Sequence, residues 1–486
     1  MGGIFSSVTK LTRNSYKLTE SEKDTLTDFA NTGYEKCKLK LSDSEIKEHQ
    51  EEIISKVRTL CDKIGELYPV FAVGDILPNG SYFNGSKIIH PDECDLLLLF
   101  KQLSVPNVNI SDVDWNNEVE VNIKTKNLKT QINDIKQSLG VEKEVINDKN
   151  NLMNITYLLG GAIHDCLSKL EGIHYIGARR LVLTSSEWDC LNRLRLHVLH
   201  QGGSTSLYKY IIGDKFSFSN ELSDSCRNGT YDPYLSPNTI ELDERGHGPC
   251  VRIRIGGGKY TTDIDLGFCI EQQQTEHGRY ILLPYNSRSP YFTPWTISVY
   301  NSKHKLDKHH NKLLMLLKLL ILECHLIPDS HTYSSHALKT RVLHHQVSCT
   351  SSEISLGGCL CDVAHHVFEL YEMKEEDGQL WIFNSKKELP DVDFRGVDVQ
   401  PRIVPGGYRS DNYWLMPVVF YITIRALRSG CCTGEEALHV DRWLIISELW
   451  NNKGEGGYRQ ISGWPPKECK IPIQKIDELI TRFYSK

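Results

Sequence analysis

The sequence predicts an α+β protein, with a mixed sheet in its first part and mostly helices in its last part. Two observations carry this prediction. Residues 251–255 and 260–270 alternate apolar and polar side chains around a glycine turn, which indicates neighbouring strands. Residues 42–67 and 306–326 repeat apolar side chains at helical spacing. Apart from the early helix at 42–67, strand-rich segments therefore precede helix-rich ones, and no internal repeat interrupts that order.

The expected elements follow in chain order. Residues 1–42 are polar and predicted to be irregular. The helix at 42–67 can be capped by Ser42 or Asp43, with Glu45 in its first turn. A turn is expected at 77–81 and short strands at 88–89 and 96–100. Residues 105–150 predict a helix and a mobile loop, and residues 216–247 predict a loop. Further helices are expected at 186–200, 306–326, 337–349 and 360–372, and the last third is expected to be largely helical.

Size and composition restrict the class of protein. The 486 residues allow two or three domains, or one bilobed unit. The 56 basic and 62 acidic residues exclude a wholly basic nucleic-acid coat protein but allow a local basic groove. The 15 cysteines follow no secretory signal, so we expect free thiols in the cytoplasm. The apolar runs 313–322 and 414–427 fall short of the roughly 18–20 residues of a membrane span and are expected to be buried helices.

The N-terminus carries a lipidation pattern. Gly2 and Ser6 match Met-Gly-x-x-x-Ser, so Gly2 is predicted to be N-myristoylated once Met1 is removed. The alternative is a flexible terminus that matches by chance. One acyl chain gives only marginal membrane binding, so the predicted membrane association of the cytoplasmic protein would be reversible.

Two acidic strand segments predict a metal site. Glu93 and Asp95 are spaced i, i+2, and in a strand they project from the same face beside an apolar run. Asp263 and Asp265 repeat this pattern far along the chain. Like charges held together are costly unless a cation compensates them, and carboxylates suit Mg²⁺. Three carboxylates from two strands can hold two Mg²⁺ ions about 3.5–4 Å apart for nucleotidyl transfer.

A turn at Gly80 and Ser81 precedes the first acidic strand. Its backbone amides and hydroxyl could approach a phosphate closely. Taken alone, a Gly-Ser pair is usually only a turn, and a Glu-x-Asp pair is usually a solvated face. The combination of this turn, a spacer of about a dozen residues, Glu93-x-Asp95 and a distant acidic strand favours a nucleotidyltransferase.

The run from Gly80 to Asp95 resembles the active-site segment of cyclic GMP–AMP synthase and the cGAS-like receptors of animals. The resemblance extends over residues 43–375 and is weak over 101–245. It implies a bilobed nucleotidyltransferase fold, with a mixed-sheet N-terminal lobe, a long spine helix and an α-helical C-terminal lobe. The implied domains are a tail at 1–42, a catalytic lobe at 43–290 with an insertion at about 101–245, and a helical lobe at 291–486.

The resemblance also implies roles for individual residues. Glu93, Asp95 and Asp265 would be the catalytic metal ligands for two Mg²⁺ or Mn²⁺ ions, with Asp263 ranked lower. Thr296 stands at the position where the family frequently has arginine, and His336 stands at the position of the family's base-stacking aromatic residue. The residues implied to contact ATP, GTP or other nucleoside triphosphates are Gly80, Ser81, Ser298, Lys318, Ser335 and His336.

Zinc is not favoured by the sequence spacing. Vertebrate cyclic GMP–AMP synthase has a His-Cys-Cys-Cys insertion before its long helix, whereas residues 301–312 contain no cysteine here. A looser cluster is Cys349, Cys359, Cys361, His365 and His366, and free cysteines on buried helices are the preferred interpretation.

Activation by a bound nucleic-acid duplex is the prediction with the least support in the sequence. Phosphate contacts are predicted at Lys303, Lys305, Lys308, Arg179 and Arg180, with a solvated helix start as the alternative for the lysines. Acidic residues outnumber basic ones in the 42–67 helix, which weakens this prediction.

Three functions remain open at this stage. The leading hypothesis is an antiviral innate-immune sensor that binds double-stranded nucleic acid, with RNA favoured over DNA, and makes a cyclic dinucleotide for a STING-type receptor. The second is a constitutive enzyme that makes a linear product. The third is a membrane-tethered adaptor on a catalytically retired fold, which the retained acidic residues disfavour.

Overall fold

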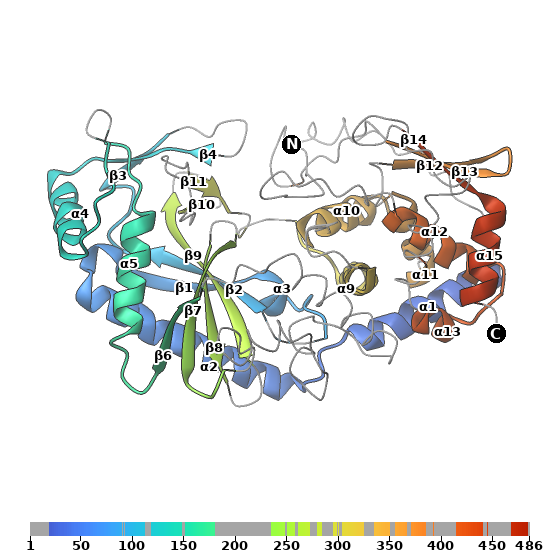
Figure 1. Ribbon diagram of the computed structural model, residues 1–486, viewed down its shortest axis with the longest axis horizontal. Coiled ribbons are helices and arrows are strands. Elements are labelled where there is room, and N and C mark those ends of the chain that lie inside the picture. Colours follow the sequence, from blue (N-terminus) through green and yellow to red (C-terminus); the bar gives the residue numbers. More distant parts are fainter. Residues whose placement is uncertain are drawn as a thin grey trace, which may run out of the picture. The chain divides into compact units, whose positions relative to one another are not determined.

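The computed structural model is of the α+β class, with a mixed sheet, as predicted (Figure 1). The chain divides into two compact units. The sheet unit comprises Cys37–Lys305 and Pro390–Asp398, and the helical unit comprises Met1–Lys36, Leu306–Leu389 and Val399–Lys486. The structure describes residues 19–89, 91, 93–111, 118–147, 151–179, 235–247, 250–257, 261–272, 279–283, 295–298, 300, 304–324, 335–349, 355–366, 371–384, 392, 415–440, 445 and 468–484.

Nine strands of the described chain form the main sheet of the sheet unit. Its order is β4-β11-β10-β9-β8-β7-β6, and β2 pairs with both β9 and β1. The β2–β9 and β6–β7 pairs are parallel and the others are antiparallel. The bounds are β1 Val73–Asn79, β2 Glu93–Phe100, β4 Glu118–Val119, β6 His174–Arg179, β7 Thr239–His247, β8 Cys250–Gly256, β9 Thr261–Gln272, β10 Arg279–Leu282 and β11 Trp295–Ile297.

The predicted long helix is α2, Asp43–Leu67, and Ser42 caps it. The Ser42 hydroxyl accepts from the Glu45 amide while the Glu45 carboxylate accepts from Ser42, which is a complete capping box. The buried face of α2 packs in one core with β2 and β9, whose inward side chains include Leu96 and Phe268. The helix therefore covers the face of these strands opposite to the acidic side chains.

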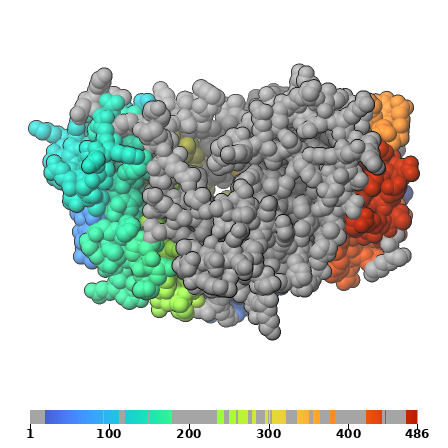
Figure 2. Space-filling view, viewed as in Figure 1, coloured from blue at the N-terminus to red at the C-terminus, as the bar shows by residue number. Residues whose placement is uncertain are grey.

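The segment after β2 forms a smaller layer of the sheet unit. Strands β3 (Val108–Ile110) and β5 (Val121–Ile123) pair antiparallel, and helix α4 (Lys126–Ser138) follows, which confirms the helix expected there. Helix α5 (Thr156–Leu167) packs on α2. Helices α4 and α5 are exposed on the face seen in Figure 2.

The helical unit contains the expected helices at shifted bounds. They are α9 Lys308–Cys324, α10 Ser335–Ser348, α11 Leu356–His366 and α12 Leu415–Arg428, and α13 Gly434–His439 and α15 Ile473–Phe483 follow. The expected helix at 186–200 lies outside the described residues. None of the helices in the described part of the chain is both long and apolar enough to cross a membrane.

The helical unit also contains a sheet that the sequence interpretation missed. Strands β12 (Tyr371–Glu376), β13 (Gln379–Asn384) and β14 (Glu468–Pro472) are antiparallel, so residues 371–372 extend a strand and not the predicted helix. Asp377 and Gly378 both have positive φ, at 51° and 68°. An Asp-Gly pair in this conformation makes a two-residue hairpin turn, and that pair is the signal that could have predicted the hairpin.

A second difference is helix α1, Glu20–Cys37, within the segment predicted to be irregular. Leu26, Phe29 and Ala30 are fully buried or nearly so. A Cβ on Gly357 would collide with the backbone at Leu26 and Thr27, and one on Gly434 would collide with Phe29. Close contact with α11 and α13 therefore fixes α1, and local sequence does not display those contacts.

Candidate active site

The acidic residues predicted from the sequence lie side by side on β2 and β9. These strands are parallel, and their register pairs Glu93 with Asp263 and Asp95 with Asp265. The carboxylates therefore form two adjacent rows on one face of the sheet. Asp265 is the most buried of the four, at 8% exposed, and the others are partly exposed. The structure thus brings together all three predicted metal ligands and the lower-ranked Asp263.

Two arginines on β8 pair with the carboxylates of these two rows. The antiparallel register places Arg252 opposite Asp265 and Arg254 opposite Asp263. Arg252 donates to both Asp265 oxygens at 2.6 and 2.8 Å and to Glu93 Oε1 at 2.7 Å. Arg254 donates to Asp263 at 3.2 Å and to Glu241 at 2.7 Å. These arginines were not predicted as site residues, although their i, i+2 spacing on a predicted strand puts them on one face.

The pKa values of the two acids of β2 are shifted in opposite directions. Burial acts to raise the pKa of Glu93, but Lys87, at 3.3 Å, and Arg252 outweigh it and lower that pKa to about 2. Burial, together with the charges of Glu93 and Asp265, raises the pKa of Asp95 to about 6. Among the described residues, the carboxylate of Asp95 has no hydrogen-bond or ion-pair partner, whereas Glu93 and Asp265 both have one. Asp95 is therefore the carboxylate on which an added cation would act most strongly.

The Gly80–Ser81 turn lies directly against Asp95. Asn79 of β1 pairs with Asp95, and the short helix α3 (Gly80–Phe83) begins at the next residue. Gly80 has a φ of +74°, and a Cβ at this position would overlap with the Asp95 carboxylate. Only glycine meets both conditions, the left-handed backbone and the close approach. The structure thus places the predicted turn directly beside the predicted acidic strand.

A chain of hydrogen bonds ties this turn to α2 and β9. His49 of α2 contacts the Tyr82 hydroxyl through Nδ1 at 2.8 Å and the Thr262 hydroxyl through Nε2 at 3.0 Å. The Thr262 hydroxyl also donates to the Pro91 carbonyl at 3.2 Å. Because Tyr82 follows Ser81 and Thr262 precedes Asp263, α2 positions both sides of the site.

We expect the Tyr82→Phe variant to be less stable by about 1 kcal/mol, because it removes one of the two hydroxyl groups that contact the half-buried His49 ring, while the contact with Thr262 stays. The loss should appear as a lower denaturant midpoint with an unchanged slope in urea unfolding. A midpoint equal to that of the unmodified chain would show that the His49–Tyr82 contact contributes nothing to stability.

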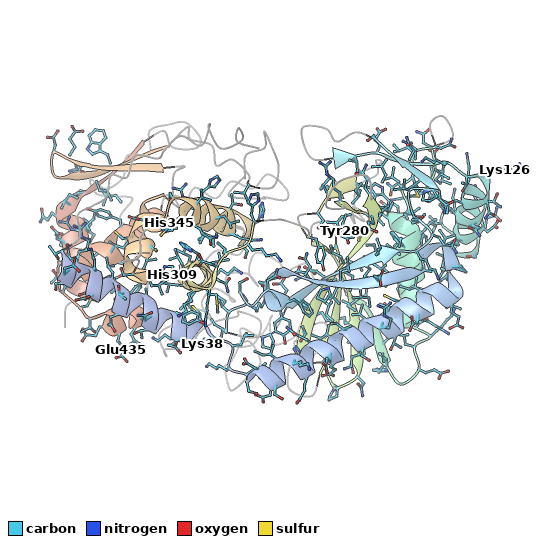
Figure 3. The ribbon with its side chains drawn as sticks, turned by 180° about the vertical axis from the view of Figure 1, so that it is seen from behind. Lys38, Lys126, Tyr280, His309, His345 and Glu435 are labelled. Carbon is cyan, nitrogen blue, oxygen red and sulfur yellow. The ribbon has the colours of Figure 1, made fainter. Side chains whose placement is uncertain are left out.

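The other predicted site residues are placed as follows. Ser298 follows β11, and its amide donates to the Tyr280 carbonyl of β10, labelled in Figure 3. Lys318, Ser335 and His336 belong to α9 and α10 of the helical unit, so they are described within that unit alone. Lys305 and Lys308 are exposed, and Arg179 ends β6. Gly2, Lys303 and Arg180 lie outside the described residues.

The described lysines of α2 are engaged with carboxylates of the same helix. Lys47 pairs with Glu51, Lys56 with Glu52, and Lys63 with Glu66. These i, i+3 and i, i+4 pairs reduce the positive charge that the helix can offer to a phosphate backbone.

Comparison with known proteins adds no family assignment: no protein-family model matches the chain, and no curated protein matches it in sequence.

Proposed function

We propose that this chain is a nucleotidyltransferase of bilobed fold that joins two nucleoside triphosphates into a cyclic dinucleotide. The observation that supports it best is the parallel register of β2 and β9, which aligns Glu93 and Asp95 with Asp263 and Asp265. The contact between Gly80 and Asp95 adds the phosphate-approach turn to the same site. A merely structural acidic face does not require a glycine packed on its least compensated carboxylate.

The donor set fits Mg²⁺. Glu93, Asp95 and Asp265 offer hard carboxylate oxygens from adjacent strands, and burial together with the charges of Glu93 and Asp265 raises the pKa of Asp95. These three residues would hold the two proposed ions, Mg²⁺ or Mn²⁺. When bound, the ions would lower the pKa of an attacking hydroxyl and neutralise charge on the triphosphate.

The chain's own residues prepare the site. Arg252 fixes the orientation of Asp265 by its two hydrogen bonds, and Lys87 with Arg252 keeps Glu93 ionised. Gly80 lets the backbone of the turn approach Asp95, so that Ser81 can contact a triphosphate held beside the carboxylates. The proposed contacts of Ser298, Lys318, Ser335 and His336 with the nucleotides rest on the family resemblance.

The sensing role is proposed from that resemblance together with two exposed lysines, Lys305 and Lys308. A double-stranded RNA, or a DNA duplex, would be bound through phosphate contacts with little sequence preference. The internal pairing of the α2 lysines favours a contact surface away from that helix. Gly2 myristoylation would give reversible membrane association in the cytoplasm, and a STING-type receptor would read the product in antiviral immunity.

The function is tested by incubating the purified full chain with the four nucleoside triphosphates, Mg²⁺ or Mn²⁺, and RNA or DNA duplexes. Products are identified by mass spectrometry and treated with phosphatase. A phosphatase-resistant cyclic dinucleotide supports the proposal. A phosphatase-sensitive oligonucleotide would instead identify the linear-product enzyme, and absence of any product under every condition contradicts nucleotidyl transfer.

We expect the Asp95→Asn variant to lose product formation by at least about 100-fold, yet to be more stable than the unmodified chain without metal. The pKa of Asp95 is about 6 in the folded chain against an ordinary 3.8. Ionised Asp95 therefore destabilises the fold as pH rises from 3.8 through 6. In EDTA at neutral pH, the variant should unfold about 2–4 °C higher, and the difference should disappear in acid.

Asp75→Asn is the matched control, because Asp75 is exposed on β1. It should change neither activity nor the unfolding temperature. Full cellular activity of the Asp95→Asn variant would favour the adaptor hypothesis over the enzyme.

A further inference from the structure

Three helices of the helical unit bring together four side chains that are far apart in the sequence. His310 lies in the first turn of α9, His345 and Cys349 lie at the end of α10, and Cys359 lies in the first turn of α11. One ligand atom from each of the four lies within 4.8 Å of the other three. Figure 3 labels His345 and the neighbouring His309 on these helices.

The two sulfur atoms have the spacing of a metal-bound pair. Cys349 Sγ and Cys359 Sγ are 3.7 Å apart. Two thiolates on a tetrahedral zinc ion, each at about 2.3 Å, would be about 3.8 Å apart. A disulfide needs about 2.05 Å, so the two thiols are not bonded to each other.

The orientation of His310 is set for metal binding. Its Nδ1 lies 2.9 and 2.8 Å from the two Asp307 oxygens, so Nδ1 carries the proton and donates it. This leaves the lone pair on Nε2, which is buried and without a hydrogen-bond partner in the described part of the chain. A buried acceptor left unsatisfied is costly, and a metal ion would satisfy it. A carboxylate behind a ligating histidine is the usual outer partner in zinc sites.

Asp307 is itself held in place. Its backbone amide donates to the Gln346 side chain at 3.0 Å, and its carboxylate accepts the His310 backbone amide at 2.8 Å. Because Gln346 lies next to His345 on α10, the same contacts hold α9 and α10 in register. The cluster has one further neighbour, because His309 Nε2 lies 3.3 Å from the Cys359 sulfur.

We propose that His310, His345, Cys349 and Cys359 bind one structural zinc ion that fixes α9, α10 and α11 together. Two thiolates and two imidazoles suit Zn²⁺ and not Mg²⁺. Four protein ligands close the tetrahedron, which is typical of structural sites. Binding transfers one proton from each cysteine to solvent as the two Zn–S bonds form. The site shares only Cys349 and Cys359 with the cluster considered from the sequence, because folding brings in two histidines that no short spacing connects to them.

The proposal is tested on the purified full chain by measuring zinc content after dialysis, and by exchanging zinc for Co²⁺. We expect one zinc per chain and, with Co²⁺, the visible bands of a tetrahedral site together with thiolate-to-cobalt charge transfer. Cys359→Ser should lose most of the metal and the charge-transfer intensity. Cys361→Ser is the matched control on the same helix, since both cysteines are 3% exposed, and it should retain both.

Asp307→Asn provides a test that leaves all four ligands in place. It should weaken zinc affinity about 10- to 100-fold in a competition with a chromogenic chelator, while saturating zinc restores full occupancy. The proposal is overturned if the unmodified chain retains no zinc and shows no thiolate bands with Co²⁺, if a Cys349–Cys359 disulfide is found, or if Cys361→Ser loses as much metal as Cys359→Ser. These readouts do not depend on nucleotidyl transfer.

Discussion

Replacing Gly80 by alanine should reduce dinucleotide formation by at least about 100-fold while the chain stays folded. The new Cβ would overlap with the Asp95 carboxylate, and the φ of +74° at this position is costly for any residue with a side chain. Either Asp95 or the Gly80–Ser81 turn must move. A displacement of about 1 Å in a reacting site is enough for such a loss. The measurement is the initial rate of product formation at saturating triphosphate and Mg²⁺.

Gly85→Ala is the control for this result. Gly85 has a similar φ of +68°, but a Cβ there meets nothing within 4 Å. It therefore carries the backbone strain of the substitution without the collision with Asp95, and should keep most of the activity. If both variants lose activity equally, strain in the turn is responsible and the contact with Asp95 is not. An active Gly80→Ala variant would remove the turn from the proposed site.

The sequence was sufficient to predict the acidic rows because strand geometry is local. Alternation places Glu93 with Asp95, and Asp263 with Asp265, on one face without any tertiary information. The two pairs lie side by side because β2 pairs with β9 in parallel. Strand alternation does not predict this pairing, and only the metal chemistry and the family resemblance indicated that the two pairs share one site.

The features that were missed depend on long-range contacts. The partners of Arg252 and Arg254 are set by the β8–β9 register, and α1 depends on close packing with α11 and α13. The cluster of His310, His345, Cys349 and Cys359, proposed to bind zinc, needs three helices to fold together before its side chains are neighbours. The hairpin at Asp377 and Gly378, by contrast, had a local signal that could have predicted it.

The Arg252→Met variant should be less stable by about 3–5 kcal/mol without metal, and Mg²⁺ should restore much of that loss. Arg252 is largely buried and pairs with Glu93, Asp263 and Asp265, at 2.7, 3.6 and 2.6 Å. Methionine keeps much of the volume but leaves these carboxylates without their shared cation. If Glu93 and Asp265 are metal ligands, Mg²⁺ can replace the lost charge. The unfolding temperature should therefore rise more with Mg²⁺ in the variant than in the unmodified chain.

The stability difference between the Arg252→Met variant and the unmodified chain should also depend on pH. Burial acts to raise the pKa of Glu93, but Lys87 and Arg252 lower it to about 2 from an ordinary 4.5. The stability from these pairs is therefore present above pH 4.5 and lost as pH falls toward 2. Over that interval, the difference in free energy of unfolding between the Arg252→Met variant and the unmodified chain should become smaller.

Arg254→Met separates a general loss of charge from a loss at the metal ligands. Arg254 pairs with Glu241 and Asp263, and its removal leaves the bonds from Arg252 to Glu93 and Asp265 in place. This control should be destabilised, yet its response to Mg²⁺ should equal that of the unmodified chain. A larger Mg²⁺ response in Arg252→Met alone assigns the ion to Glu93 and Asp265. An equal response in both variants would mean that Mg²⁺ acts on acidic charge in general, and the proposed metal ligands would then be wrong.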